Sequence, residues 1–247
     1  MTTKVVPGQL VAMPDAAGVA REASSRVAKA LRSAIARSGH ATLALSGGNT
    51  PREAYALLGR DRTVDWTRVD LFWVDERAVA PTHERSNYLT AKATLLDAIA
   101  PPSGRVHRMP GEAADLDAAA RDYERAIREH VELGGDGVPA FDVVVLGIGD
   151  DGHTASLFPG DAATIDERHR LVVPVAARGE LEARLTLTAP ALEHARTVLL
   201  LAVGAGKRAA LERAWLAQGD VHDTPARVVR GCQGVVTWII DKAAGGL

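Results

Sequence analysis

The segment from Phe141 to Gly160, F-D-V-V-V-L-G-I-G-D-D-G-H-T-A-S-L-F-P-G, constrains the fold of this chain most strongly. It begins with an apolar run, which is typical of a strand buried in a parallel sheet. The run is followed by glycines and by polar residues: Gly147, Gly149, Gly152, Asp150, Asp151 and His153. Glycines let the backbone turn sharply beside a ligand, and the polar side chains supply acid, base and hydrogen-bonding groups. Because ligands bind at the carboxyl ends of strands in open α/β sheets, this segment predicts a strand that leads into a functional loop.

The run from Gly147 to Gly152 also satisfies the G-x-G-x-x-G pattern of dinucleotide-binding loops. We disfavour that interpretation, because two carboxylates would repel a pyrophosphate and because Pro159 and Gly160 leave little length for the helix that should hold it. A purely structural turn is the alternative for each glycine taken singly. It does not explain why Asp151 and His153 stand together after a buried strand.

The remaining sequence alternates between strand patterns and helix patterns. We expect further strands over residues 10–13, 41–45, 69–74, 106–109, 171–176, 185–187, 197–203 and 235–240, and helices over 16–38, 51–58, 88–99, 113–133, 190–195 and 204–217. Asp15 is the expected N-cap of the first helix, and Asn49 or Thr50 that of the second. The alternation predicts one α/β domain over residues 1–247, an open, mostly parallel twisted sheet with helices on both faces.

Composition excludes several classes of protein. The chain has 247 residues, 47% of them hydrophobic and 24% charged, which is ordinary for a globular domain. The formal net charge of -2 argues against general nucleic-acid affinity. The single cysteine, Cys232, excludes an internal disulfide, and the first 13 residues lack the pattern of a signal peptide. No stretch reaches the roughly 18 apolar residues of a membrane span. We therefore expect a cytoplasmic protein without a nucleic-acid, membrane or obligate protein partner.

Three further polar clusters stand at expected strand ends. Ser46-Gly47-Gly48-Asn49-Thr50-Pro51 joins a strand to a helix, so its amides and hydroxyls can bind an anion, although it lacks the lysine of a Walker A loop. Gly204-Ala205-Gly206-Lys207 is similar and offers a lysine to a phosphate, unless that lysine is simply solvated. Asp75-Glu76-Arg77 is either a solvated ion-pair cluster or a site where Arg77 holds an anion with two hydrogen bonds. We expect the clusters to meet at one edge of the sheet.

His153 is the strongest candidate for a general base. An ordinary imidazole has a pKa of about 6.5 and so exchanges protons near neutral pH. Asp151 stands two residues away and could orient the ring. No metal site is convincing, because the eight histidines are scattered and no H-E-x-x-H motif is present. Asp150, Asp151 and His153 alone do not distinguish metal ligation from acid-base chemistry.

Taken together, these motifs resemble the family that comprises 6-phosphogluconolactonases and glucosamine-6-phosphate deaminases. The matching segments are L-S-G-G-N-T-P at 45–51, W-V-D-E-R at 73–77, S-N-Y at 86–88 and L-G-I-G-D-D-G-H-T-A-S-L-F-P-G at 146–160. Weaker agreement continues through R-L-T-L-T at 184–188, the loop at 204–207, P-A-R-V at 225–228 and the strand around Trp238. The likeness covers nearly the whole chain, and its longest motif is highly specific.

The resemblance implies an open α/β sheet and a cytoplasmic reaction without a cofactor. In that reaction, 6-phospho-D-glucono-1,5-lactone is hydrolysed to 6-phospho-D-gluconate in the oxidative pentose phosphate pathway. The resemblance also implies that His153 is the catalytic base and Asp151 its partner. The residues that it implies for the phosphosugar site are Ser46, Gly47, Gly48, Thr50, Asp75, Arg77, Lys207 and Arg184.

Two other functions stay open at this point. A deaminase of the same family would open and isomerise an amino sugar phosphate with release of ammonia, using the Asp75 region as a proton carrier. Arg77 and the run Thr154 to Phe158 resemble the lactonase form instead. A phosphosugar-binding regulator would keep the glycine loops and would need no His153. Such regulators usually carry a DNA-binding module, and the sequence shows none.

Overall fold

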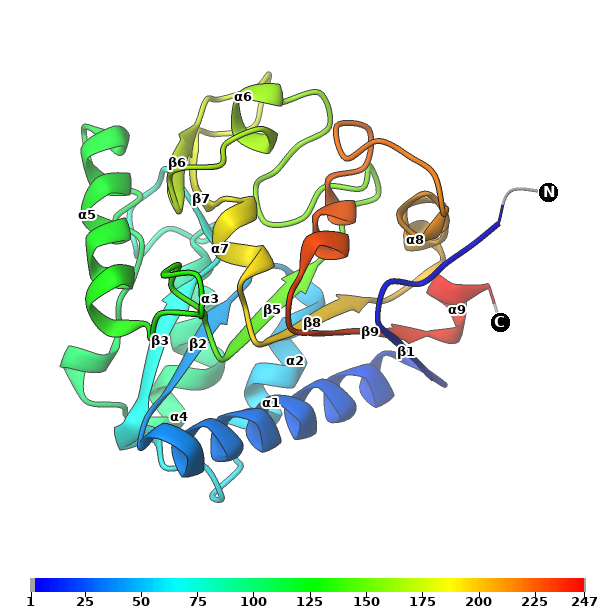
Figure 1. The fold of residues 1–247 in the computed structure, drawn as a ribbon. Coiled ribbons are helices and arrows are strands. Elements are labelled where there is room, and N and C mark those ends of the chain that lie inside the picture. The colour runs from blue at the N-terminus through cyan, green and yellow to red at the C-terminus, as the bar shows by residue number, and fades with distance from the viewer. Residues whose placement is uncertain (1–2, 247) are drawn as a thin grey trace.

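The computed structural model describes residues 3–246, and its centre is a six-stranded parallel sheet (Figure 1). The strand order is β1-β9-β8-β5-β2-β3, and all neighbours run parallel. The strands are β1 (Gln9–Met13), β2 (Ala41–Leu45), β3 (Val69–Trp73), β5 (Val143–Gly147), β8 (Thr197–Ala202) and β9 (Val235–Asp241). The apolar runs of β2, β3 and β8 are buried almost throughout, as the sequence predicts for parallel strands covered on both faces.

The order of the strands reverses beside β2. After β2 the chain steps outward to β3, at one edge of the sheet, and then returns to place β5 on the other side of β2. The connections that follow β2 and β5 therefore diverge. In open α/β sheets, such a reversal leaves a crevice at the carboxyl ends of the two strands, and ligands bind there.

Helices cover both faces of the sheet, which confirms the predicted fold class. In Figure 1, α1 (Ala16–Ser38) and α2 (Asn49–Leu58) lie below the sheet, and α7 (Ala189–Glu193) lies above it. The other helices are α3 (Asn87–Ala91), α4 (Asp97–Ile99), α5 (Leu116–His130), α6 (Ala162–Ile165), α8 (Arg208–Trp215) and α9 (Lys242–Gly245), with a π-helical turn at Lys92–Leu96 between α3 and α4. Single helical turns of the 3-10 type occur at Trp66–Arg68, Ser103–Arg105 and Ala205–Lys207, and a longer one at Pro225–Gly231.

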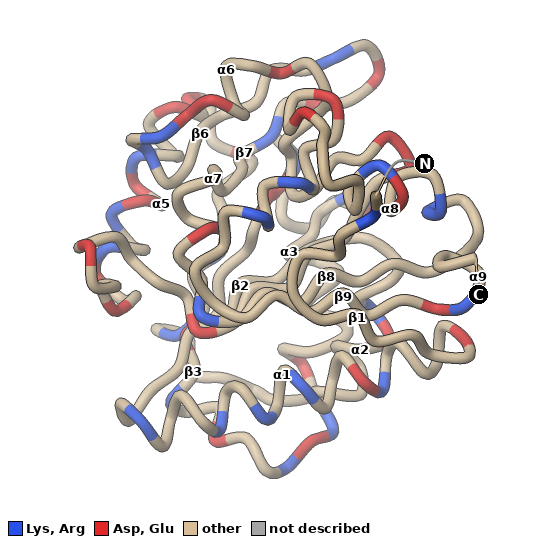
Figure 2. The backbone as a smooth tube through the Cα atoms, turned by 45° about the vertical axis from the view of Figure 1, so that its right-hand side comes forward, with Lys and Arg blue, Asp and Glu red and all other residues tan. Residues whose placement is uncertain are grey.

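Charge and capping follow the expected pattern around this core. Asp15 accepts a hydrogen bond of 2.7 Å from the Gly18 N–H and so caps α1, as predicted. Lys, Arg, Asp and Glu residues are intermixed over the outer helices and loops, and few lie on the central strands (Figure 2). Within residues 3–246, no helix combines the length and the apolar character that crossing a membrane requires.

A second, smaller sheet corrects the prediction of a single one. It is antiparallel, with the order β4-β7-β6, and consists of β4 (Asp75–Arg77), β6 (Val172–Val175) and β7 (Arg184–Leu187). Asp75, Glu76 and Arg77 are therefore strand residues, where the sequence suggested a loop. Val74 explains the change: its N–H still donates to Leu45 O at 2.9 Å, but its carbonyl accepts from the Leu187 N–H at 2.7 Å. The backbone thus leaves one sheet and joins the other at this residue.

The strand expected at 106–109 does not form. Val106 makes a single bridge to Leu71, and the His107 N–H donates to Leu71 O at 2.8 Å. The chain then turns away, because Pro110 has no N–H and because the Gly111 N–H closes a tight turn onto Met109 O at 3.0 Å. The helix expected at 88–99 begins one residue earlier and is divided into α3, the π-helical turn and α4. The helices expected at 113–133 and 190–195 are observed as α5 and α7, and that at 204–217 as a 3-10 turn followed by α8, with ends one to three residues from those expected.

A buried tyrosine completes the hydrogen bonding at the end of β3. The Tyr123 hydroxyl accepts from the Trp73 N–H at 2.7 Å and donates to Trp73 O at 3.2 Å. β3 is an edge strand, so these backbone groups have no neighbouring strand on that side. Burial raises the pKa of Tyr123, so the hydroxyl stays neutral and can both donate and accept.

We expect the Tyr123→Phe substitution to lower the free energy of unfolding by about 1–3 kcal/mol, because two buried backbone groups lose their partner. Urea unfolding followed by circular dichroism measures this change. Tyr88→Phe is the matched control, since the Tyr88 hydroxyl has no hydrogen bond to the described part of the chain. Equal stability of the two variants would contradict the role given to Tyr123.

Candidate active site

A cleft of about 690 Å³, including the open space at its mouth, lies at the carboxyl ends of β2 and β5, where the strand order reverses. Its lining residues are Ser46, Gly47, Gly48, Asn49, Thr50, Pro51, Asp75, Arg77, Asn87, Gly147, Ile148, Gly149, His153, Ala155, Arg184, Leu201 and Lys207. Nine of the ten site residues predicted from the sequence are among them. The tenth, Asp151, is not part of the lining and contacts His153 instead.

The loop after β2 presents backbone amides to this cleft. Gly48 occupies the N-cap position of α2 with a φ of 95°, and no side chain caps the helix, so the expectation that Asn49 or Thr50 would do so is wrong. The positive φ of Gly48 favours glycine at this turn. At Gly47, a Cβ atom would lie 1.8 Å from Asn87 Oδ1, so only glycine fits. The uncapped helix N-terminus is suited to an anion.

A tyrosine also fixes the start of this loop. The Tyr55 hydroxyl accepts from the Ser46 N–H at 3.0 Å and donates to Ser46 O at 3.1 Å. Tyr55 is buried on α2, so this pair of hydrogen bonds ties the loop to the helix that follows it. The Ser46 hydroxyl is buried and has no protein partner within residues 3–246, which leaves it available to a ligand.

Two arginines face each other across the small sheet. Arg77 on β4 pairs directly with Arg184 on β7, and both line the cleft. Like charges in directly opposed positions destabilise a sheet unless an anion lies nearby. Burial lowers the pKa of Arg184, Asp75 counteracts this, and the charge of Arg77 lowers the pKa further. In the described chain, the buried Nε groups of both arginines lack a partner, so a bound anion would satisfy them.

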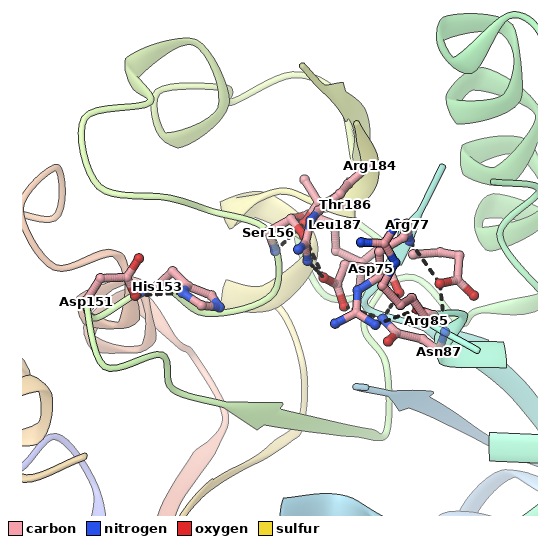
Figure 3. Close-up of polar contacts among 11 residues, drawn as sticks. Asp75, Arg77, Arg85, Asn87, Asp151, His153, Ser156, Arg184, Thr186 and Leu187 are labelled. Atoms are coloured by element: carbon pink, nitrogen blue, oxygen red, sulfur yellow. Dashed lines mark hydrogen bonds and ion pairs between the residues drawn. The ribbon is translucent and has the colours of Figure 1, made fainter. Parts of the chain in front are cut away.

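Asp75 is engaged by neighbouring side chains on both of its oxygens. Ser156 Oγ donates to Asp75 Oδ2 at 2.6 Å, and Asn87 Nδ2 donates to Asp75 Oδ1 at 3.1 Å (Figure 3). Arg184 Nη1 lies 3.6 Å from Asp75 Oδ2. Asp75 therefore holds other residues of the cleft in position. Sequence reasoning did not assign Asn87 or Ser156 to the site, although both fall within the matching motifs.

Glu76 organises the neighbouring segment. Its buried carboxylate accepts hydrogen bonds from the N–H groups of Arg77 (2.9 Å), Asn87 (2.8 Å) and Tyr88 (2.8 Å) and from Ser86 Oγ (2.9 Å). Burial raises the pKa of Glu76, and these donors offset part of that rise. Glu76 thus fastens the start of α3 to β4. Its role was not foreseen from the sequence, because it depends on a contact between segments ten residues apart.

His153 and Asp151 form a close pair in the loop after β5. His153 Nδ1 lies 2.6 Å from Asp151 Oδ1, and the same oxygen accepts from the His153 N–H at 3.0 Å (Figure 3). Burial acts to raise the pKa of Asp151, but the hydrogen bonds and charge of His153 lower it below its ordinary value. A Cβ at Gly149 would lie 2.1 Å from His153 Nδ1, so glycine is needed there. Within residues 3–246, His153 Nε2 has no hydrogen-bond partner and remains available.

A second histidine with the same local arrangement shows what distinguishes His153. In Asp220-Val221-His222, the His222 N–H and Nδ1 each lie 2.8 Å from Asp220 Oδ1. Its Nε2, however, lies 2.8 Å from Asp166 Oδ1. The hydrogen bonds to Asp220 and Asp166 raise the pKa of His222, which favours the charged form, and the residue is not part of the cleft lining. A free Nε2 in the cleft is therefore specific to the predicted base.

Lys207 brings a further positive charge to the cleft from the β8 side. It lies in the 3-10 turn Ala205–Lys207, and Gly204 begins this turn with a φ of 91°. The Gly204 N–H donates to the Asp241 carboxylate at 3.0 Å, which anchors the turn to the end of β9. Lys207 Nζ lies 2.7 Å from Asp150 Oδ1, and Asp150 is largely exposed.

One group of side chains in residues 3–246 has the composition of a metal site: Asp70, His107 and His130, whose ligand atoms lie within 4.8 Å of one another. It lies on β3 and the segments beside it, away from the cleft residues. Both Asp70 oxygens are already engaged, by Arg105 Nη1 at 2.5 Å and by His107 Nε2 at 2.8 Å. We interpret the group as hydrogen-bonded side chains around the ion pair of Asp70 with Arg105.

The fold and the cleft define a class of α/β proteins with an anion-binding loop at the point of strand reversal. The family described as glucosamine-6-phosphate isomerases/6-phosphogluconolactonase matches residues 14–238, and the chain belongs to this family. A 6-phosphogluconolactonase from a Synechocystis species is 39% identical over 213 residues, which cover 86% of this chain and 86% of that protein.

Further relatives agree with this assignment. A 6-phosphogluconolactonase from Homo sapiens is 35% identical over 236 residues, which cover 94% of this chain and 88% of that protein. The solved structure of a 6-phosphogluconolactonase from Trypanosoma cruzi matches with a TM-score of 0.84 at 29% identity, over 99% of this chain and 98% of that chain. The likeness therefore extends over nearly the whole fold.

Loss of the Tyr55 hydroxyl should loosen the loop after β2. We expect Tyr55→Phe to weaken the binding of inorganic phosphate several-fold, because Ser46 loses both backbone contacts while the apolar packing of the ring is kept. Isothermal titration calorimetry measures the affinity. Tyr123→Phe is the comparison: it removes the same kind of backbone contact at the end of β3, and because Tyr123 does not line the cleft, phosphate affinity should change less. If the two variants bind phosphate alike, the loop does not depend on Tyr55.

Proposed function

We propose that this protein hydrolyses 6-phospho-D-glucono-1,5-lactone to 6-phospho-D-gluconate in the cytoplasm, as a step of the oxidative pentose phosphate pathway. One observation carries the proposal: a histidine with a free Nε2, oriented by a carboxylate, lies in the same cleft as two directly opposed arginines. The first feature suits proton transfer at a reacting carbonyl, and the second suits a phosphate. The names of the relatives support this substrate.

The phosphate end of the substrate would lie against the positively charged side of the cleft. Arg77, Arg184 and Lys207 supply three positive charges there, and the uncapped N-terminus of α2 supplies backbone amides. Ser46, Gly47 and Gly48 form the loop before this helix, and Thr50 lies in its first turn. In this arrangement, Asp75 acts indirectly, by holding Ser156 and Arg184.

At the lactone end, His153 Nε2 takes a proton from a water molecule as the water oxygen attacks the C1 carbonyl. The tetrahedral intermediate then collapses, the bond from C1 to the ring oxygen breaks, and the imidazolium returns the proton to that oxygen. Asp151 stabilises the imidazolium, because its lowered pKa keeps it ionised at neutral pH. Backbone amides stabilise the developing oxyanion, an effect worth roughly 3 to 4 kcal/mol per donor. No serine or cysteine nucleophile takes part.

The structure also bears on the deaminase alternative. A proton carrier at Asp75 needs a carboxylate oxygen free to approach the substrate. Here Ser156 and Asn87 engage the two oxygens at 2.6 Å and 3.1 Å, which favours a structural role for Asp75. Ammonia release from glucosamine 6-phosphate, measured in parallel with lactone hydrolysis, separates the two activities. Phosphosugar binding without either activity would indicate a regulator.

We expect His153→Ala to lower kcat about 100-fold or more with little change in KM, because the base acts in the transition state and not in ground-state binding. The assay follows loss of freshly made lactone above its spontaneous hydrolysis. His222→Ala is the matched control, since it removes a histidine with the same Asp-x-His arrangement outside the cleft. Near-normal turnover of His153→Ala would rule out this base.

Lys207→Ala should raise KM about tenfold and change kcat less, because Lys207 contacts the phosphate and not the reacting carbonyl. The measurement is the substrate dependence of the lactonase rate. Lys4→Ala provides the control, because Lys4 pairs with Glu212 at 3.0 Å outside the cleft and so tests the loss of an ion-paired lysine alone. An unchanged KM in Lys207→Ala would remove this residue from the phosphate site.

A further inference from the structure

Phe158 contacts both functional parts of the cleft. Its side chain is nearly buried, with 7% of the residue exposed. On one side its ring centroid lies 4.8 Å from that of His153, with the two rings inclined at 45°. On the other side, Arg184 Cζ lies 5.2 Å from the ring centroid. One aromatic ring thus touches the proposed base and the proposed phosphate ligand.

We propose that Phe158 is a positioning residue for the reaction, one that holds His153 and Arg184 in a fixed relation to each other. This inference rests on the proposed function. Phe158 does not line the cleft itself. It acts through His153 and Arg184, which do. Its ring sets the direction of His153 Nε2 and the plane of the Arg184 guanidinium. The lactone carbonyl and the phosphate group of one substrate can then bind to the two residues at the same time.

The local fold brings Phe158 back onto His153. A turn covers Thr154 to Leu157, in which the Leu157 N–H donates to Thr154 O at 3.0 Å. Ala155, at the second position of this turn, has a φ of 48°, a conformation that non-glycine residues rarely adopt. Because of this turn, two aromatic rings five residues apart in sequence come into contact.

The turn is anchored to the small sheet at its third residue. Ser156 donates its hydroxyl proton to Asp75 on β4 at 2.6 Å, and its N–H donates to Thr186 Oγ1 on β7 at 3.1 Å. β7 also carries Arg184. The ring of Phe158 and the guanidinium of Arg184 are therefore held by the same pair of strands, which fixes their separation.

Arg184 depends on the ring because its polar contacts are weak. Its Nη1 lies 3.4 Å from Ser156 Oγ and 3.6 Å from Asp75 Oδ2, and its Nε has no partner within the described residues. A planar guanidinium gains both cation–π attraction and orientation from an aromatic face. For His153, the bond to Asp151 fixes one ring nitrogen, and contact with Phe158 limits rotation about that bond.

The test compares Phe158→Leu, which keeps an apolar side chain without the ring, with Phe158→Tyr, which keeps the ring. We expect Phe158→Leu to raise KM about threefold to tenfold through Arg184, as loss of a cation–π contact would, and to lower kcat about tenfold through His153. Phe158→Tyr should retain most of both parameters. If Leu and Tyr give the same kinetics, or if Phe158→Leu leaves kcat and KM unchanged, the inference is overturned.

Phe141→Leu is the matched control for a loss of core packing. Phe141 is fully buried against Phe72 and does not line the cleft. The Phe141→Leu variant should have a lower free energy of unfolding, whereas kcat and KM of the folded protein should be unchanged. A change in kinetics as large as that of Phe158→Leu would show that any damaged core has this effect, and would overturn the inference.

A double-mutant cycle with Arg184→Lys tests the route through Arg184. Lysine keeps the charge but not the planar group, so Phe158→Leu should raise KM less in the Arg184→Lys background than in the wild type. Equal effects in both backgrounds would exclude coupling through Arg184.

Calorimetry with inorganic phosphate repeats the comparison without turnover. If the wild type binds phosphate but shows no lactonase activity, the proposed function fails on its own, and the cycle measured with phosphate still decides the Phe158–Arg184 contact.

Discussion

The passage of the backbone from one sheet to the other at Val74 is the constraint on which the rest of the site depends. The N–H of this residue belongs to the parallel sheet and its carbonyl to the antiparallel one. As a result, Asp75, Glu76 and Arg77 emerge beside the loop that follows β2. Without this crossing, the polar residues after β3 would form a solvated loop, and Arg77 could not pair with Arg184.

Much of the cleft is built from charges that are unfavourable on their own. Two arginines lie opposite each other, Arg184 is largely buried, and Asp75 and Glu76 are buried nearby. The carboxylates are satisfied by hydrogen bonds from Ser156, Asn87 and the start of α3, whereas the arginines keep unpaired donors. A bound anion would give these donors the partners that they lack. The close packing of these polar side chains also leaves no room for a Cβ at positions 47 and 149.

The two Asp-x-His segments show that a local motif does not define a function. Asp151 and His153 have the same short contacts as Asp220 and His222, because a carboxylate two residues before a histidine readily accepts from its N–H and its ring. They differ in what surrounds the far side of the imidazole. Asp166 engages His222 Nε2, whereas His153 Nε2 is free beside the cleft. Only tertiary contacts make that difference.

The sequence alone predicts the parallel α/β architecture and the grouping of polar residues at strand ends, because both follow from local periodicity and from glycine and capping patterns. It placed His153, the Ser46 to Thr50 loop and Lys207 at the carboxyl ends of their strands. It did not predict the second sheet or the capping position of α2, and it wrongly predicted a strand at 106–109. It also missed the roles of Tyr55, Glu76, Asn87, Ser156 and Phe158. These depend on partners nine to 81 residues away, or on a turn whose left-handed residue is an alanine, Ala155. Pairing between distant segments, and the burial that makes a hydrogen bond or an aromatic face decisive, exist only once the chain has folded.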